Sequence, residues 1–165
     1  MMLNIHSSCV LLSRAGEAFG APTDAGILLL GESGAGKSDL ALRLIAAGAE
    51  LVADDRVELS GESNRLIARA PKNLAGLIEI RNVGIVALPY APQAAVALAV
   101  QLGAGENLPR LPEHEFFGPP GLELAKESRP PLIRLNAFEA SAPAKIAAAA
   151  SAFAHALFRE NLKPN

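Results

Sequence analysis

Short apolar runs, separated by segments rich in glycine, proline and polar residues, mark the chain up to residue 102. Runs of this length are typical of buried strands, and alternation of apolar and polar residues is typical of strands with one buried face. We expect strands at residues 9–12, 27–30, 51–53, 57–59, 66–67, 78–80, 83–88, 96–102 and 133–135. A turn through Asp24 should follow the first strand, and residues 60–64 should form a hairpin turn.

Apolar residues recur at helical spacing in two places. Leu40, Leu44 and Ala47 follow this spacing until Gly48, which is expected just beyond the end of the helix. One short helix is also expected near residues 122–125. The order of strands and helices predicts an α/β fold, a single P-loop NTPase-like domain spanning residues 1–165 with a mixed β-sheet flanked by helices.

A second helix is expected near the C-terminus. Ser141 is expected to cap it, with Pro143 in its first turn. The apolar face of this helix should pack on the core and comprises Ile146, Ala150, Phe153 and Leu157.

Composition limits the class of protein. With 165 residues, half of them hydrophobic, the chain can bury a sizeable core. Its net charge of −2 lacks the basic excess of nucleic-acid-binding proteins, so no nucleic acid partner is expected. Cys9 is the only cysteine, which indicates a reducing compartment. Because there is neither a signal peptide nor a long uninterrupted apolar span, we expect a soluble, cytoplasmic protein without a membrane partner.

The stretch GESGAGKS carries the strongest chemical signal. It has the spacing G-x-x-x-x-G-K-[ST] of a phosphate-binding P-loop, between a predicted strand and a predicted helix. Glycines let backbone N–H groups approach an anion, Lys37 can reach the β- and γ-phosphates, and the Ser38 hydroxyl can bind Mg²⁺. We therefore expect ATP and Mg²⁺ as cofactors, with the nucleotide on Gly31, Glu32, Ser33, Gly34, Ala35, Gly36, Lys37 and Ser38.

Two aspartates follow the next predicted strand. In a P-loop fold the strand ends beside the glycine loop face the nucleotide, so Asp54 or Asp55 can hold Mg²⁺ or accept a proton. On an extended chain successive side chains point to opposite sides, which predicts separate roles for the two carboxylates.

GESGAGKS, the following DLALRLIAAGAELVADDRVEL and the later IEIRNVGIV together resemble the catalytic C-terminal domain of the HPr kinase/phosphorylase family. That family uses ATP to phosphorylate a serine of the phosphocarrier protein HPr, and its full-length members also remove the phosphate with inorganic phosphate. The resemblance implies an ATP- and Mg²⁺-dependent serine kinase that acts on HPr or an HPr-like phosphocarrier. Such an enzyme regulates carbohydrate metabolism and the phosphotransferase system.

The resemblance also implies roles for individual residues. It makes Lys37 the phosphate lysine, Ser38 and Glu79 the Mg²⁺ ligands, Asp55 the proton acceptor with Asp54 beside it, His6 the active-site histidine and Arg110 an active-site arginine.

The chain departs from the family pattern in three respects. Asn82 follows IEIR where the family has glycine, and asparagine can still adopt a positive φ. The basic C-terminal loop of the family is not recognisable in residues 129–145, so kinase activity without efficient phosphorolysis is expected. The chain is also expected to be a short form lacking the N-terminal regulatory domain. Apart from these departures, the resemblance implies a homo-oligomer.

Two other functions stay open on the residues alone. One is a small-molecule kinase or nucleotidase on the same scaffold, and the other is a non-catalytic module that senses ATP and binds a partner. A carboxylate at Asp55 favours chemistry, because a pure nucleotide binder needs no base. The altered C-terminal loop favours the alternatives, because it would weaken recognition of a protein substrate.

Overall fold

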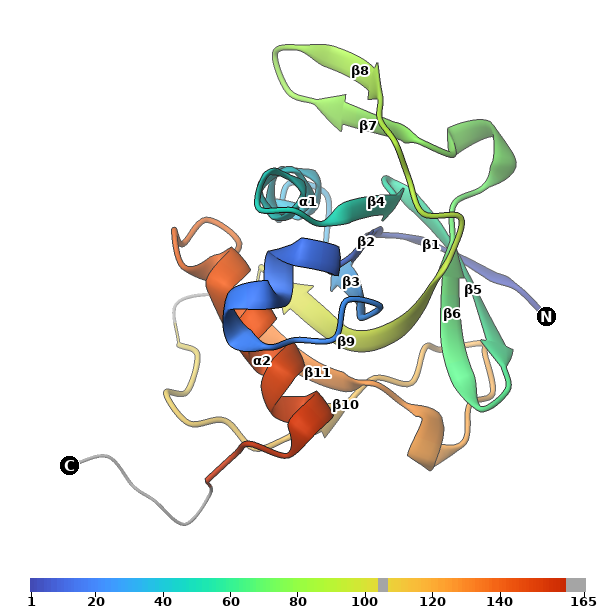
Figure 1. The fold of residues 1–165 in the computed structure, drawn as a ribbon. Coiled ribbons are helices and arrows are strands. Elements are labelled where there is room, and N and C mark those ends of the chain that lie inside the picture. The colour runs from blue at the N-terminus through green and yellow to red at the C-terminus, as the bar shows by residue number, and fades with distance from the viewer. Residues whose placement is uncertain (104–106, 160–165) are drawn as a thin grey trace.

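The computed structural model describes residues 1–103 and 107–159, and its architecture is the mixed α/β fold that the sequence predicts (Figure 1). The helices are η1 (Ser13–Phe19), α1 (Lys37–Ala46), η2 (Lys72–Leu74), η3 (Lys126–Ser128) and α2 (Ala142–His155), with η denoting 3₁₀-helices. The strands are β1 (Leu3–His6), β2 (Ser8–Leu11), β3 (Gly26–Leu30), β4 (Glu50–Ala53), β5 (Arg56–Glu62), β6 (Arg65–Arg69), β7 (Leu77–Ile80), β8 (Gly84–Ala87), β9 (Ala94–Leu102), β10 (Glu115–Phe116) and β11 (Pro131–Leu135).

Within the described residues, one large mixed sheet has the strand order β1-β5-β6-β9-β3-β2-β4, with β11 also beside β9 and β10 beside β11. Strand β9 joins its two parts: its first residues pair antiparallel with β6, and its later residues pair parallel with β3 and β11. All five residues of β3 are buried, which explains the continuous apolar run in its sequence. The strand that leads into the phosphate loop is therefore held on both edges, by β2 and β9.

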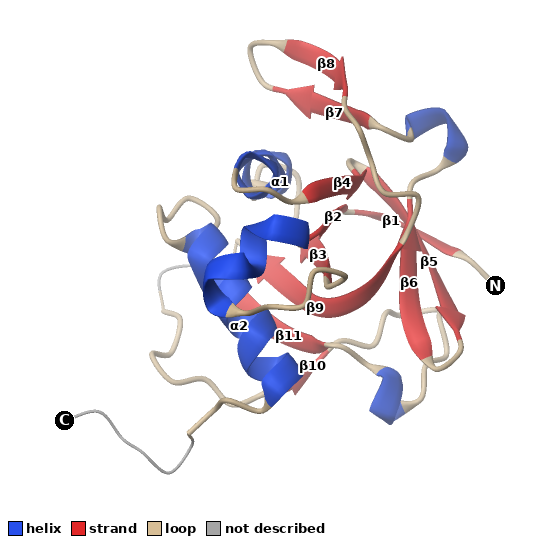
Figure 2. Cartoon of the chain, viewed as in Figure 1, coloured by secondary structure: helices blue, strands red, loops and turns tan. Residues whose placement is uncertain are grey.

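The apolar residues form two buried clusters. In Figure 2, α1, α2 and η1 gather on the same side of β3 and β9. The cluster under these helices includes Ile27, Leu29, Leu40, Leu44 and Ile146. The other cluster includes Leu28, Val52, Val57, Leu59 and Leu66, and β5 and β6 contribute the last three of these residues. Successive residues of β3 thus contribute to opposite clusters, as the strand pleat requires.

The hairpin of β7 and β8 stands apart from the large sheet. It projects beyond α1 and β4 (Figure 1), and its two strands pair only with each other among the described residues. Asn82 in its turn has a φ of 67°, the positive value that the sequence allowed. The turn end of this hairpin lies close to the acidic pair through Glu79 of β7, as described below.

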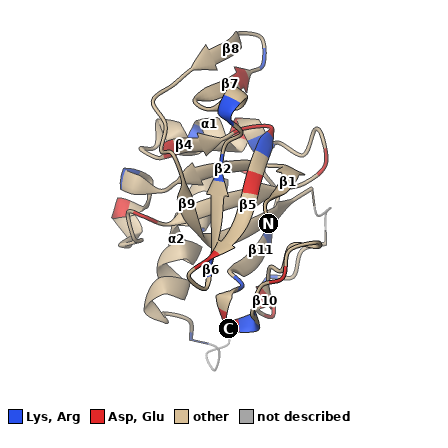
Figure 3. Ribbon diagram, turned by 90° about the vertical axis from the view of Figure 1, so that its right-hand side faces the viewer, with Lys and Arg blue, Asp and Glu red and all other residues tan. Residues whose placement is uncertain are grey.

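Charged residues are mixed over the surface. In Figure 3, acidic and basic positions are interspersed along the ribbon rather than gathered on one element. Arg69 pairs with Glu62 on β5 and β6, and Arg134 pairs with Glu115 on β10 and β11. No helix within residues 1–103 and 107–159 is both long and apolar enough to cross a membrane.

Local predictions were wrong where short-range signals compete. Residues 122–125 are not helical, and the 3₁₀-turn lies later, at η3. Leu122 and Leu124 pack against the second cluster from an extended segment, so their spacing of two reflects a strand-like course. The segment before Asp24, expected to be a turn, contains η1, and two further strands, β1 and β10, had no apolar run to indicate them.

Turn and helix ends also differ from expectation. The β5–β6 hairpin turns at Ser63 and Asn64, which have φ values of 49° and 59°, so both strands extend further than predicted. Ser141 occupies the N-cap position of α2 but makes no side-chain capping hydrogen bond. Leu157 lies beyond the end of this helix and is half exposed. By contrast, Gly48 follows the end of α1 with a φ of 118°, as predicted.

Candidate active site

The phosphate loop joins β3 to α1 and contains three glycines with positive φ. Gly31, Gly34 and Gly36 have φ values of 151°, 87° and 96°, a region that costs other residues strain. Gly36 is the N-cap of α1, so the unpaired N–H groups of the first helical turn and the positive end of the helix dipole face the loop. This arrangement is suited to binding an anion.

Lys37 lies across the loop. Its Nζ donates hydrogen bonds to the backbone oxygens of Gly31 at 2.6 Å and Glu32 at 2.9 Å. Burial lowers the pKa of Lys37 below its ordinary value, and the carboxylates of Asp55 and Asp54 partly offset this effect. The ammonium group therefore contacts the loop carbonyls and feels the charge of the acidic pair. The negative charge of a phosphate bound in the loop would neutralise it there.

Asp54 is the buried centre of the site. Its Oδ1 accepts hydrogen bonds from Ser38 Oγ at 2.7 Å and Ser8 Oγ at 2.8 Å, and its Oδ2 accepts one from the backbone N–H of Glu79 at 3.3 Å. Only 4% of Asp54 is exposed. Four separate segments, namely β2, α1, the end of β4 and β7, thus meet on one carboxylate.

Asp55 turns away from this centre. Its φ of 68° places it in the left-handed region, and Arg56 N–H donates to Asp54 O across the turn at 2.8 Å. The two carboxylates separate because of this tight turn between β4 and β5, and not because the chain is extended as the sequence reasoning assumed. The Asp55 side chain is 64% exposed and open to an incoming group.

His6 reaches Asp55 from β1. His6 pairs with Arg56 in the antiparallel β1–β5 ladder, which brings Nε2 of His6 to 3.8 Å from Oδ1 of Asp55. The sequence suggested the histidine but not the strand that carries it. The structure therefore brings together His6, Lys37, Ser38, Asp54, Asp55 and the backbone of Glu79.

The donor set suits a magnesium ion. Mg²⁺ prefers oxygen ligands and takes few of them from the protein. The Ser38 hydroxyl and the Asp54 carboxylate already touch, and the exposed Glu79 side chain belongs to the residue next to them. No cluster of three or more His, Cys, Asp or Glu side chains suitable for a metal occurs in the part of the chain that the structure describes. A hydrated ion shared with phosphate oxygens fits this set better than a cation held by protein ligands alone.

Arg110 lies elsewhere. It lines a cavity of about 1040 Å³ together with residues of β11 and the later part of α2, including Arg134 and Phe153. None of the lining residues belongs to the phosphate loop or the acidic pair. The structure thus does not bring Arg110 to the site, and its catalytic role stays a prediction.

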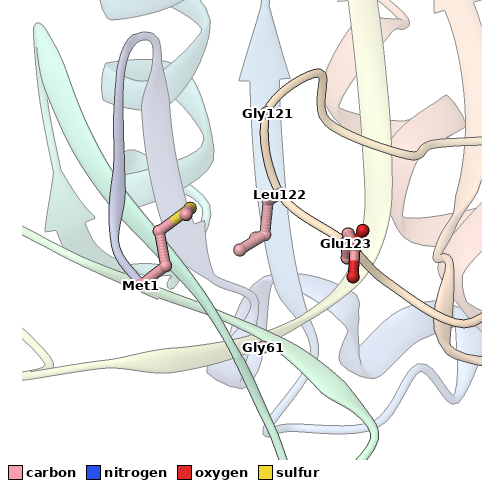
Figure 4. A pocket seen from close by; sticks show the side chains of 5 residues that line it. All are labelled: Met1, Gly61, Gly121, Leu122 and Glu123. Carbon is pink, nitrogen blue, oxygen red and sulfur yellow. The ribbon is translucent and has the colours of Figure 1, made fainter.

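A second cavity also lies outside the site. It has a volume of about 590 Å³ and lies between the β5–β6 hairpin, Met1 and the 121–123 segment (Figure 4). Leu122 and Glu123 extend from the tan segment near it, and no phosphate-loop residue lines it. Neither of these two cavities therefore belongs to the candidate site.

Sequence reasoning missed two contributors. Ser8 is fully buried and orients Asp54, but it is the first residue of β2 and belongs to no motif. Arg43 on α1 donates hydrogen bonds to the backbone oxygens of Ala137 and Glu139, which fixes the 136–139 segment next to the loop. Both act through long-range contacts that the local sequence does not reveal.

The site has a strand, a glycine loop and a helix in succession, and the loop serine donates a hydrogen bond to a carboxylate. This arrangement defines a P-loop nucleotide-binding fold. Comparison with known proteins agrees: residues 21–91 match the profile of the HPr Serine kinase C-terminal domain. The resemblance predicted from the motifs is therefore confirmed over this segment.

Individual relatives show the same similarity. The HPr kinase/phosphorylase of Clostridium beijerinckii is 49% identical over 61 residues, which cover 37% of this chain and 20% of that protein. The enzyme of the same name from Caldicellulosiruptor bescii is 52% identical over 62 residues, with the same coverages of 37% and 20%. These matches thus span about a fifth of the relatives' length.

A solved structure extends the similarity of fold to most of the chain. The HPr(Ser) kinase/phosphatase from Coxiella burnetii superposes with a TM-score of 0.65 at 24% identity, covering 88% of this chain and 91% of that one. The fold beyond residue 91 is therefore shared even though the sequence match ends there.

Proposed function

We propose that this chain is an ATP- and Mg²⁺-dependent serine kinase that phosphorylates HPr or an HPr-like phosphocarrier. The observation that carries the proposal is the pairing of a buried carboxylate with the loop serine, next to a second, open carboxylate. The Ser38 hydroxyl donates a hydrogen bond to Asp54 at 2.7 Å, whereas the next residue, Asp55, is exposed. A nucleotide-binding module needs the first carboxylate but not the second.

The phosphate loop would hold the triphosphate. Backbone N–H groups at the start of α1 and the Lys37 ammonium supply positive potential for the β- and γ-phosphates. Ser38, Asp54 and Glu79 would hold Mg²⁺, which when bound neutralises charge on the phosphates. Ser8 keeps the Asp54 carboxylate oriented toward Ser38.

Asp55 would act as the general base. A serine hydroxyl loses its proton as its oxygen bonds to the γ-phosphorus and the bond from that phosphorus to ADP breaks. A carboxylate in reach can accept this proton, and such help is worth about 10²–10⁴-fold in rate. His6, whose Nε2 lies 3.8 Å from Oδ1 of Asp55, would orient the Asp55 carboxylate.

The test compares Asp55→Asn with Asp54→Asn in single-turnover transfer of phosphate from ATP to purified HPr. Asp55→Asn should bind Mg-ATP normally and slow transfer about 10²–10⁴-fold. Asp54→Asn should change Mg²⁺ dependence and stability. Asp24→Asn removes the same charge from an exposed turn at the other end of β3 and should behave as wild type.

Near-normal transfer by Asp55→Asn, with loss in Asp54→Asn, would reverse the roles of the two residues. If wild-type protein binds ATP but transfers no phosphate to HPr, the ATP-sensing alternative gains support. If it phosphorylates small molecules instead, the small-molecule kinase alternative does. The same assay run backwards with inorganic phosphate tests the expectation that phosphorolysis is weak.

A further inference from the structure

The segment between β11 and α2 packs directly against the last glycine of the phosphate loop. A Cβ atom added to Gly36 would lie 2.9 Å from Cβ of Ala137 and 3.1 and 3.2 Å from Cζ and Cε1 of Phe138. The edge of the Phe138 ring therefore faces the residue at which α1 begins. No sequence motif marks this approach, because the two residues are far apart in the chain.

Several interactions hold this segment in place. Arg43, from within α1, donates hydrogen bonds to the backbone oxygens of Ala137 and Glu139. The side-chain oxygen of Asn136 accepts a hydrogen bond from Phe138 N–H at 3.0 Å, and Ala137 is buried in the core. The backbone that carries Phe138 is thus fixed to the helix of the phosphate loop.

Phe138 is 68% exposed, although its neighbour Ala137 is buried. Single exposed apolar residues are common and by themselves indicate nothing. Phe138 differs because its exposed ring is attached to an anchored backbone and touches the phosphate loop. An aromatic surface in this position can serve a ligand that the loop already holds.

We propose that Phe138 forms the base-binding part of the nucleotide site, on which the nucleobase of a nucleoside triphosphate stacks. This inference rests on the proposed function, since it assumes a triphosphate in the loop. A nucleotide held by its β- and γ-phosphates leaves its ribose and base at the rim of the loop. The Phe138 ring lies at that rim, where α1 begins.

The chemistry of the ring indicates how selective this contact is. Every base has a π-face, so stacking on an aromatic ring tolerates different bases. Of the side-chain oxygens in this segment, that of Asn136 accepts a hydrogen bond from Phe138 N–H, and one of Glu139 accepts a hydrogen bond from Lys145 Nζ. We therefore expect dependence on the presence of a base, with ATP and GTP bound similarly.

Calorimetric titration with ATP and with tripolyphosphate, which has no base, tests the proposal in the presence of Mg²⁺. Phe138→Ala should weaken ATP binding about 5- to 150-fold, the range reported for base stacking on aromatic residues, and leave tripolyphosphate binding unchanged. Phe138→Trp, which keeps an aromatic ring at this position, should bind ATP about as tightly as wild type. Phe116→Ala removes an exposed aromatic ring on β10 and should change neither affinity.

The other outcomes separate the two proposals. Equal weakening of both ligands by Phe138→Ala would mean that the ring only shapes the loop, and no weakening of either would mean that it does not contact the base. Each result overturns the stacking inference while leaving the kinase proposal intact. If wild-type protein binds neither ligand, the proposed function fails and the inference fails with it.

Discussion

Replacing Gly36 by alanine tests how the phosphate loop is built, because Gly34 offers a matched control. Both glycines have positive φ values, 96° for Gly36 and 87° for Gly34. An added Cβ at Gly36 would lie 2.9 Å from Cβ of Ala137, whereas at Gly34 nothing lies within 4 Å. The two substitutions share the backbone strain, and only one adds a steric clash.

The expected magnitudes follow from these distances. The left-handed conformation costs a non-glycine residue about 1–2 kcal/mol, which is the whole effect expected for Gly34→Ala. Ala137 is buried and held by Arg43, so it cannot easily yield, and overpacking of this kind costs about 1–3 kcal/mol more. Gly36→Ala should therefore lower the free energy of unfolding by about 2–5 kcal/mol in total.

Urea denaturation followed by circular dichroism measures both effects. With a slope of about 1–3 kcal/mol per molar urea, the two variants should differ in midpoint by roughly 1 M. Midpoints that agree within error would refute the packing of residues 137–138 on the loop. In that case Phe138 would also lose its anchored position beside the nucleotide.

Three further predictions concern single side chains. Lys37→Ala should abolish measurable ATP binding in calorimetry while the circular dichroism spectrum stays native, because it removes the charge that faces the phosphates; unchanged binding would contradict the P-loop assignment. Cys9 is fully buried and burial raises its pKa to about 12, so a chromogenic disulfide reagent should modify it only after denaturation; rapid reaction of native protein would contradict this burial. Hydrogen bonds from Arg69 and Ser60 lower the pKa of Glu62 to about 2, so its stabilising effect should be present above pH 4.5 and lost as the pH falls toward 2. Glu62→Gln should therefore flatten the pH dependence of thermal stability in that range, and an unaltered profile would show that the pair contributes nothing.

The central strands and the phosphate loop were predictable because their signals are local. Residues 27–30 are a continuous apolar run, as burial on both faces requires, and residues 96–102 are mostly apolar and mostly buried; both are strands. The glycine spacing of the loop reports backbone angles directly, since φ values near 90° recur in it. The first helix follows from its apolar spacing and from Gly48.

Other parts of the site depend on pairing that the local sequence does not encode. β1 has alternating burial and only four residues, and it exists because it pairs with β5. His6 reaches Asp55 through that pairing alone. Likewise, the buried role of Ser8 arises because β2 lies between β3 and β4, close to the end of β4 where Asp54 begins the turn.

The position of β9 has a consequence for how the chain folds as it is synthesised. The segment 21–91 contains the phosphate loop, α1 and both aspartates, but β9 begins only at Ala94. The far end of β9 contributes to the loop itself, because a Cβ on Gly31 would lie 3.2 Å from the backbone oxygen of Leu102. A nascent chain that has reached only residue 91 lacks one wall of the loop and one hydrogen-bonded edge of β3. Ribosome-bound chains should therefore lack nucleotide affinity until residue 102 has left the exit tunnel, and should reach full affinity only after residues 136–139 have emerged as well.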